Sequence, residues 1–148
     1  MKSVPIRIVI ADDHKMIREA WKLLLEQDER FIIIAECSNG TEAIEAAMNH
    51  EPDIILMDIN MNPVNGFEAT RKILKQTPSV KIIGMSINDQ PAYCRNLLQL
   101  GAKGYVTKNS SKEEMINAIL QVYDGKQFIC KEIKIKMQKP GDDLLFQG

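Results

Sequence analysis

Short apolar runs alternate strictly with helical patterns along most of this 148-residue chain, and this alternation limits its fold more than any other feature. Five runs have the length and composition of buried strands, at residues 6–11, 31–35, 54–57, 80–85 and 104–106. A segment with helical periodicity follows each of them. Five such units fold most economically with right-handed crossovers. The sequence therefore predicts an α/β domain, a doubly wound parallel five-stranded sheet with helices on both faces.

Three of the expected helices begin with a capping signal, an Asn or Ser followed by Glu three residues later. These pairs are Asn39 with Glu42, Asn65 with Glu68, and Ser111 with Glu114. Helical spacing predicts inward faces at Ile17, Ala20 and Leu24 (with Met16 and Leu23 beside them), at Ala43, Ile44, Ala47 and Met48, at Phe67, Thr70, Ile73 and Leu74, and at Met115, Ile116, Ile119, Leu120 and Tyr123.

Composition indicates one ordinary globular domain. The chain is 45% hydrophobic and 26% charged, and its net charge of −1 gives no electrostatic reason to expect a nucleic-acid or membrane surface. No signal peptide is evident, and no apolar stretch approaches the about 20 residues that span a bilayer. Three scattered cysteines, with no metal-ligand spacing, favour idle thiols in a reduced compartment. We expect a cytoplasmic protein with no membrane partner.

The periodic pattern decays after Gly125, so we expect the domain to span residues 4–126. Residues 127–148 are predicted to be a linker toward an effector domain that is not in this chain, or an engineered tail. Pro140-Gly141 interrupts this segment, and its last five residues, 144–148, are similar to part of an engineered protease site.

Polar side chains follow the ends of several of the expected strands. Asp12 and Asp13 follow the first, Asp58 ends the third, Ser86 follows the fourth, and Lys108 lies just past the fifth. Because the carboxyl ends of parallel strands share one edge of a sheet, these five residues are expected to converge there. Taken singly, each has a plain structural interpretation, as a helix cap, a turn residue or a solvated lysine. Their joint occurrence favours a site.

Three carboxylates held together repel one another, and a divalent cation with oxygen ligands relieves that repulsion. An all-oxygen set on an open rim indicates Mg²⁺. Adding Lys108 and a hydroxyl makes the set suitable for phosphoryl transfer. In this hypothesis Asp58 is the nucleophile, Asp12 and Asp13 hold Mg²⁺, and Lys108 and Ser86 contact the phosphoryl group. His14 is interpreted as an ordinary residue at a helix N-terminus.

The residues from about 6 to 123 strongly resemble the receiver domain of two-component response regulators. The matching residues are Asp12-Asp13, Asp58, Met61-Asn62-Pro63, Asn65-Gly66, Ser86, Gly104-Tyr105-Val106 and Lys108. The runs Ala11-Asp12-Asp13-His14 and Lys108-Asn109-Ser110, with Arg18, resemble the NarL/LuxR-type branch.

This resemblance implies a flavodoxin-like sheet of order 2-1-3-4-5. It implies that Asp58 accepts a phosphoryl group from a sensor histidine kinase. The chain would then be a stoichiometric phosphoacceptor and not an enzyme, catalysing only its own phosphorylation and dephosphorylation. Asp13, Asp58 and the backbone carbonyl of Asn60 would hold Mg²⁺, with Asp12 assisting. Lys108, Ser86 and the backbone N–H of Ile87 would contact the phosphoryl group.

The resemblance also implies a switch. Ser86 would move toward the phosphoryl group, and the fourth helix, fifth strand and fifth helix would change their surface. Tyr105 would turn inward in this switch, or is an ordinary core residue. The output would be homodimerisation on phosphorylation and transcriptional regulation through a C-terminal helix-turn-helix domain. DNA would be bound only through that absent domain.

Two other functions stay open. A haloacid-dehalogenase-type phosphatase also uses a strand-end Asp, a Lys and Mg²⁺, but it needs a second acid where this chain has Asn60. A pseudo-receiver that no longer takes phosphate is the other, and the intact set of acids, hydroxyl and lysine argues against it.

Overall fold

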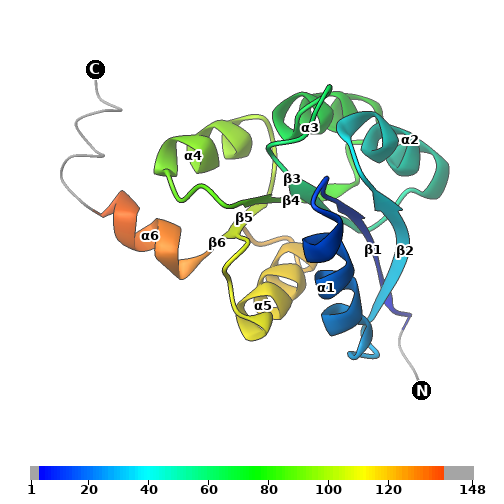
Figure 1. The fold of residues 1–148 in the computed structure, drawn as a ribbon, viewed down its shortest axis with the longest axis horizontal. Helices are drawn as coiled ribbons and strands as arrows, with labels where there is room; N and C mark the ends of the chain where they lie inside the picture. The colour runs from blue at the N-terminus through cyan, green and yellow to red at the C-terminus, as the bar shows by residue number, and fades with distance from the viewer. Residues whose placement is uncertain (1–3, 139–148) are drawn as a thin grey trace.

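The computed structural model describes residues 4–138, which form a parallel sheet with helices on both faces (Figure 1). Its six strands have the order β2-β1-β3-β4-β5-β6. They are β1 (Ile6–Ala11), β2 (Phe31–Cys37), β3 (Ile54–Asp58), β4 (Lys81–Ser86), β5 (Gly104–Thr107) and β6 (Phe128–Ile129). The predicted doubly wound fold and the order 2-1-3-4-5 are confirmed, and a sixth strand extends the predicted five.

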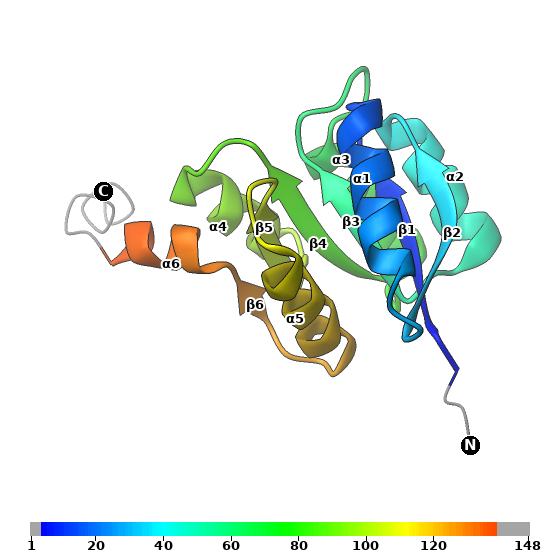
Figure 2. The ribbon, with the colours of Figure 1, turned by 60° about the horizontal axis from the view of Figure 1, so that its bottom comes forward.

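The helices form two outer layers. One face of the sheet is covered by α1 (Lys15–Glu26) and α5 (Lys112–Tyr123), and the other by α2 (Gly40–His50), α3 (Gly66–Gln76) and α4 (Pro91–Gln99) (Figures 1 and 2). A last short helix, α6 (Lys131–Met137), lies beside α4. No helix within residues 4–138 has the length and apolar character required to cross a membrane.

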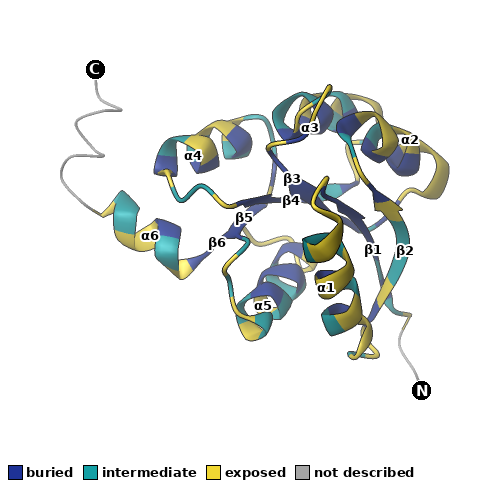
Figure 3. Ribbon diagram, in the orientation of Figure 1, coloured by how far each residue is buried: buried dark blue, intermediate teal, exposed yellow. Residues whose placement is uncertain are grey.

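The core is centred on β3, which pairs with β1 on one side and β4 on the other. All five of its residues are buried (Figure 3). A strand covered by helices on both faces has no solvent side, which explains why its apolar run is unbroken. Asp58 ends this strand with 0% exposure, so the folding of the core carries a carboxylate to a buried position.

All three predicted capping signals are confirmed. The side chains of Asn39, Asn65 and Ser111 each accept a hydrogen bond from the backbone N–H three residues later. The carboxylate of Glu114, however, does not return to its own cap, because it accepts a hydrogen bond from the backbone N–H of Lys131 at 2.8 Å. It thereby joins the start of α5 to the start of α6.

Several predicted inward positions on the helices are wrong. Met16, Leu23, Met48 and Tyr123 are 85%, 67%, 53% and 44% exposed, and Ala20 is exposed as well. Trp21 and Leu25 are buried in α1 instead, and Ala46 and Val122 are buried in α2 and α5.

Residues 127–138 were predicted to be part of a linker, but the structure has β6 and α6 here. The backbone N–H of Cys130 donates to the carbonyl of Tyr105 at 3.0 Å, and Cys130 and Ile133 are buried in the core. A two-residue strand and a helix rich in lysine give too weak a periodic signal to predict from sequence. Residues 139–148, which hold the Pro140-Gly141 break and the expected tail, lie outside the described residues.

Candidate functional site

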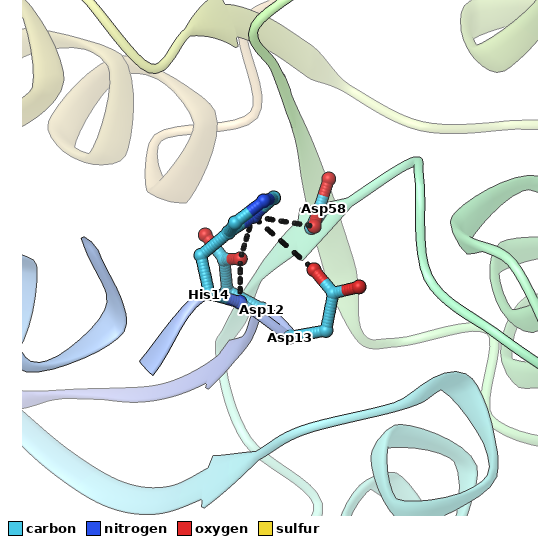
Figure 4. Close-up of side chains that lie close together, drawn as sticks. All are labelled: Asp12, Asp13, His14 and Asp58. Carbon is cyan, nitrogen blue, oxygen red and sulfur yellow. Dashed lines mark hydrogen bonds and ion pairs between the residues drawn. The ribbon is translucent and has the colours of Figure 1, made fainter. Parts of the chain in front are cut away.

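The carboxyl ends of β1, β3 and β4 meet at one edge of the sheet because the strands are parallel and in close register. Ala11 is paired with Met57, and Asp58 with Met85. Asp12 and Asp13 therefore emerge beside Asp58. One oxygen of each of these three carboxylates and a ring nitrogen of His14 all lie within 4.8 Å of one another (Figure 4).

Lys108 follows β5, which lies on the other side of β4 from β3, and its side chain reaches this group. Its Nζ lies 2.9 Å from both carboxylate oxygens of Asp12 and 3.2 Å from Oδ2 of Asp58. The backbone N–H of Lys108 donates to the carbonyl of Ser86, which fixes where the lysine leaves β5. We call Asp12, Asp13, Asp58 and Lys108 the acidic cluster. It contains three carboxylates for one ammonium group.

The two buried aspartates of the cluster are held by their own backbone turns. Oδ1 of Asp12 accepts from the backbone N–H of His14 at 2.8 Å, and Oδ1 of Asp58 accepts from that of Asn60 at 3.0 Å. The Asn60 side chain itself is exposed. These bonds fix the direction of each carboxylate, and the second oxygen of each contacts Nζ of Lys108.

The second oxygens are not satisfied by the protein. Oδ2 of Asp12 and Oδ2 of Asp58 are buried and accept no hydrogen bond of normal geometry from the described residues; their close contacts are ion pairs. Burial raises the pKa of Asp13, the nearby Asp58 raises it further, and His14 and Lys108 act in the opposite direction. Hard, unsatisfied oxygens in a cluster short of positive charge fit a Mg²⁺ ion.

His14 is the residue that sequence analysis placed outside the site. Its Nδ1 lies 3.2 Å from Oδ1 of Asp12 and 3.2 Å from Oδ1 of Asp13, and 3.0 Å from Nζ of Lys108. His14 is the N-cap of α1, yet its side chain makes no capping hydrogen bond. The available signal was its position directly after the aspartate pair, where the turn that orients Asp12 also directs the imidazole over the cluster.

Ser86 ends β4 and is fully buried, and its Oγ accepts a hydrogen bond from the backbone N–H of Asn88 at 2.8 Å. Ile87, between them, has an exposed side chain. The hydroxyl of the serine therefore anchors the loop that leads into α4. Strand β4 is the neighbour of β3, so Ser86 lies at the same edge of the sheet as the acidic cluster.

Tyr105 is fully buried, and its hydroxyl has no hydrogen-bond partner among the described residues. Burial raises the pKa of this phenol. Gly84 leaves the room for it, since a Cβ there would lie 3.1 Å from the Tyr105 ring and 2.1 Å from Leu97. The tyrosine thus already has the inward position that the switch hypothesis assigned to the phosphorylated state.

Comparisons with known proteins agree on one family. A model of the response regulator receiver domain matches residues 8–120. The transcriptional regulatory protein DegU of Brevibacillus brevis is 40% identical over 128 residues, which are 86% of this chain and 54% of that protein. The oxygen regulatory protein NreC of Staphylococcus epidermidis is 36% identical over 125 residues, 84% of this chain and 57% of that protein. The chain thus spans little more than half the length of these relatives.

Solved structures give the same result. The crystal structure of a LuxR-family two-component response regulator from an Aurantimonas species has a TM-score of 0.87 and 28% sequence identity, and the match covers 96% of this chain and 99% of that one. The likeness therefore extends over nearly all of both chains.

Proposed function

The chain belongs to the response regulator receiver domains, of the NarL/LuxR type, and from this premise we propose that it is a phosphoacceptor whose acceptor residue is Asp58. The observation that carries the proposal is the buried Oδ2 of Asp58, which accepts no hydrogen bond from the described part of the chain and lies 3.2 Å from Nζ of Lys108. A nucleophile needs a free lone pair, and this oxygen has one. The backbone N–H of Asn60 holds the other oxygen and sets the direction of attack.

The reaction is the transfer of a phosphoryl group from a histidine of a sensor kinase. Oδ2 of Asp58 forms a bond to phosphorus while the bond between phosphorus and the kinase imidazole nitrogen breaks, and the electron pair stays on that nitrogen. No proton has to be removed from Asp58, because the acceptor is a carboxylate. The chain contributes position and charge, which supply most of the catalysis in phosphoryl transfer.

Asp13, Asp58 and the backbone carbonyl of Asn60 would hold a Mg²⁺ ion, with Asp12 assisting. The ion supplies positive charge that offsets the negative charge of the phosphoryl oxygens during transfer. The fit rests on the excess of carboxylates over cations in the cluster and on Oδ2 of Asp12, which is buried and accepts no hydrogen bond from the described residues.

Lys108, the Ser86 hydroxyl and the backbone N–H of Ile87 would bind the phosphoryl oxygens. For Ser86 this requires a change, because its Oγ accepts from the backbone N–H of Asn88. Turning toward the phosphoryl group would release that anchor of the loop before α4. The next residue, Asp89, is ion-paired with Lys136, so the same loop is joined to α6.

The switch would therefore act through the loop after β4. With Tyr105 already buried, the moving parts would be Ser86, the loop, α4 that follows the loop, and α6 that is ion-paired with it. The surface of α4, β5 and α5 would change with them. Moving a two-state equilibrium from 1:99 to 99:1 needs roughly 5.5 kcal/mol, which a few charge-assisted hydrogen bonds can supply.

The rest of the natural protein would supply the output. The relatives are about twice as long as the matched region, and one of them is a transcriptional regulatory protein. We place a DNA-binding helix-turn-helix domain after the receiver, with phosphorylation promoting homodimerisation, and assign the whole to the cytoplasm. A histidine kinase is the upstream partner.

Neither alternative has support. Phosphatase chemistry would need an acid at position 60, where an exposed Asn60 contributes a backbone N–H to Asp58. A pseudo-receiver would be expected to lack part of the set, whereas Asp12, Asp58 and Lys108 lie in direct contact.

The test is phosphorylation by a small donor without a kinase. The protein is incubated with acetyl phosphate with and without Mg²⁺, and its intact mass is measured. The wild type and Asp53→Asn should gain one phosphoryl group only with Mg²⁺, and Asp58→Asn should gain none. Labelling of Asp58→Asn equal to that of the wild type would refute the assignment, and so would labelling of the wild type in the presence of a chelator.

A further inference from the structure

We propose that His14 is a ligand of the cation bound by the acidic cluster, and that it makes the site prefer transition-metal ions such as Ni²⁺ over Mg²⁺ more strongly than the carboxylates alone would. This rests on the proposed function, because it concerns the same site. It assigns a role to a residue that the phosphoryl-transfer mechanism does not use.

The distances suit one ion. Two neighbouring ligands of an octahedral ion, each about 2.1 Å from the metal, lie about 3.0 Å apart, and those of a tetrahedral ion about 3.4 Å apart. Nδ1 of His14 lies 3.2 Å from Oδ1 of Asp12 and 3.2 Å from Oδ1 of Asp13. Its distance to Oδ2 of Asp58 is 3.9 Å. Figure 4 shows the imidazole facing all three carboxylates, and one ligand atom of each of the four residues lies within 4.8 Å of the others.

The contacts of His14 cannot all be favourable without a cation. If Nδ1 carries a proton, it can donate to Asp12 or Asp13, but it then faces the ammonium of Lys108 at 3.0 Å as a second donor. If Nδ1 carries none, it can accept from Lys108, but its lone pair faces two carboxylate oxygens. A metal ion between the lone pair and the oxygens removes the conflict.

Lys108 can make room for the ion. Its Nζ already contacts Asp12 and Asp58 at 2.9 and 3.2 Å, so it retains these partners when it leaves His14. The buried Oδ2 of Asp12, which accepts no hydrogen bond from residues 4–138, is a second and independent sign of a ligand here.

The chemistry of the donors decides the kind of ion. Oxygen ligands alone suit Mg²⁺, whereas an imidazole nitrogen suits Zn²⁺, Ni²⁺ and Co²⁺. At any mixed site Ni²⁺ binds more tightly than Mg²⁺, so a preference in the wild type decides nothing by itself. The decisive quantity is how far the preference for Ni²⁺ over Mg²⁺ falls when the His14 imidazole is removed.

The experiment measures Ni²⁺ and Mg²⁺ binding to the whole chain by calorimetry at one fixed pH, for the wild type, His14→Ala and His50→Asn. His14→Ala removes no capping bond, and His50 is the other histidine, exposed at the end of α2. We expect His14→Ala to weaken Ni²⁺ binding about tenfold or more and Mg²⁺ binding less than about twofold. His50→Asn should behave as the wild type.

A second readout observes the nitrogen itself. In protein with ¹⁵N-labelled histidine, adding Zn²⁺ should shift the Nδ1 resonance of His14 and leave that of His50 in place. Equal losses of Ni²⁺ and Mg²⁺ binding in His14→Ala, unchanged Ni²⁺ binding, or an unshifted resonance would each overturn the inference. These results leave the proposed function intact if acetyl phosphate still labels the wild type. Failure of the wild type to bind Mg²⁺ would instead contradict the proposed function.

Discussion

The central strand β3 is bordered by an aspartate at each end, and the two aspartates have opposite surroundings. At the amino end, Oδ2 of Asp53 accepts a hydrogen bond from the backbone N–H of Arg7 at 2.8 Å, and its backbone joins β1 and β4. At the carboxyl end, Oδ2 of Asp58 accepts no hydrogen bond from any residue that the structure describes, and it lies among other carboxylates. The same residue type is satisfied at one end and left unsatisfied at the other.

The difference separates a structural carboxylate from a reactive one. Asp53 is satisfied by a neutral backbone donor, and its own backbone hydrogen bonds join β1 and β4, so its role is structural. Asp58 depends on Lys108 for positive charge and keeps a lone pair free. A buried charge without full compensation lowers stability, and proteins retain such groups mainly where they are used.

Removing Lys108 should give the largest loss of unfolding free energy. Lys108→Ala leaves two buried carboxylates without a cation, which we expect to cost about 3–5 kcal/mol of unfolding free energy. Lys72→Ala is the matched control, since its pair with Glu68 is exposed and should contribute less than about 1 kcal/mol. Urea unfolding measures both. Added Mg²⁺ should restore part of the stability lost in Lys108→Ala. Equal losses in the two variants would mean that Lys108 does not compensate the negative charge of the acidic cluster.

Neutralising the two aspartates should change stability in opposite directions. Asp58→Asn keeps the oxygen that accepts from Asn60 but removes a buried negative charge, so we expect a gain of about 1 kcal/mol or more. Asp53→Asn exchanges a charge-assisted hydrogen bond for a neutral one, and should lose about 0.5–1 kcal/mol. Chemical denaturation without divalent ions is the measurement. A loss of stability in Asp58→Asn would show that repulsion between carboxylates does not destabilise the carboxyl end of β3.

The pH dependence of Asp13 should give the smallest effect. Its pKa is raised above 3.8, so the folded state binds this proton more tightly than the unfolded state. The contribution of Asp13 to stability therefore falls as pH rises from about 3.8 through the raised pKa.

Asp13→Asn removes this dependence. Its stability relative to the wild type should rise between about pH 4 and pH 7, by on the order of 1 kcal/mol at most, because the carboxylate is partly exposed to solvent. Thermal unfolding without divalent ions at several pH values measures the difference. A difference that stays constant or falls with pH would contradict the raised pKa.

The sheet could be predicted from the sequence because buried parallel strands give unbroken apolar runs, and the strand-end residues could be predicted because topology alone brings them together. Strand β6 could not be predicted, because its pairing with β5 depends on a tertiary contact. The inward-facing residues of α1 were predicted wrongly, since the choice between Leu23 and Trp21 depends on how α1 is rotated against the sheet.

His14 and Tyr105 show the limit within the site. Whether an imidazole beside two aspartates turns over them, or a tyrosine on β5 turns inward, is a choice of rotamer. Neighbouring atoms decide that choice: the turn at Asp12 for His14, and the space above Gly84 for Tyr105. No spacing of residues along the chain contains this information.

The most direct test of the account locates the phosphoryl group. Protein treated with acetyl phosphate and Mg²⁺ is reduced with borohydride, which converts an acyl phosphate to an alcohol, and its peptides are sequenced by mass spectrometry. The account predicts reduction at Asp58 and none at Asp53, Asp12 or Asp13. Reduction at one of these other aspartates with Asp58 unchanged, or a stable phosphate on His14, would contradict it.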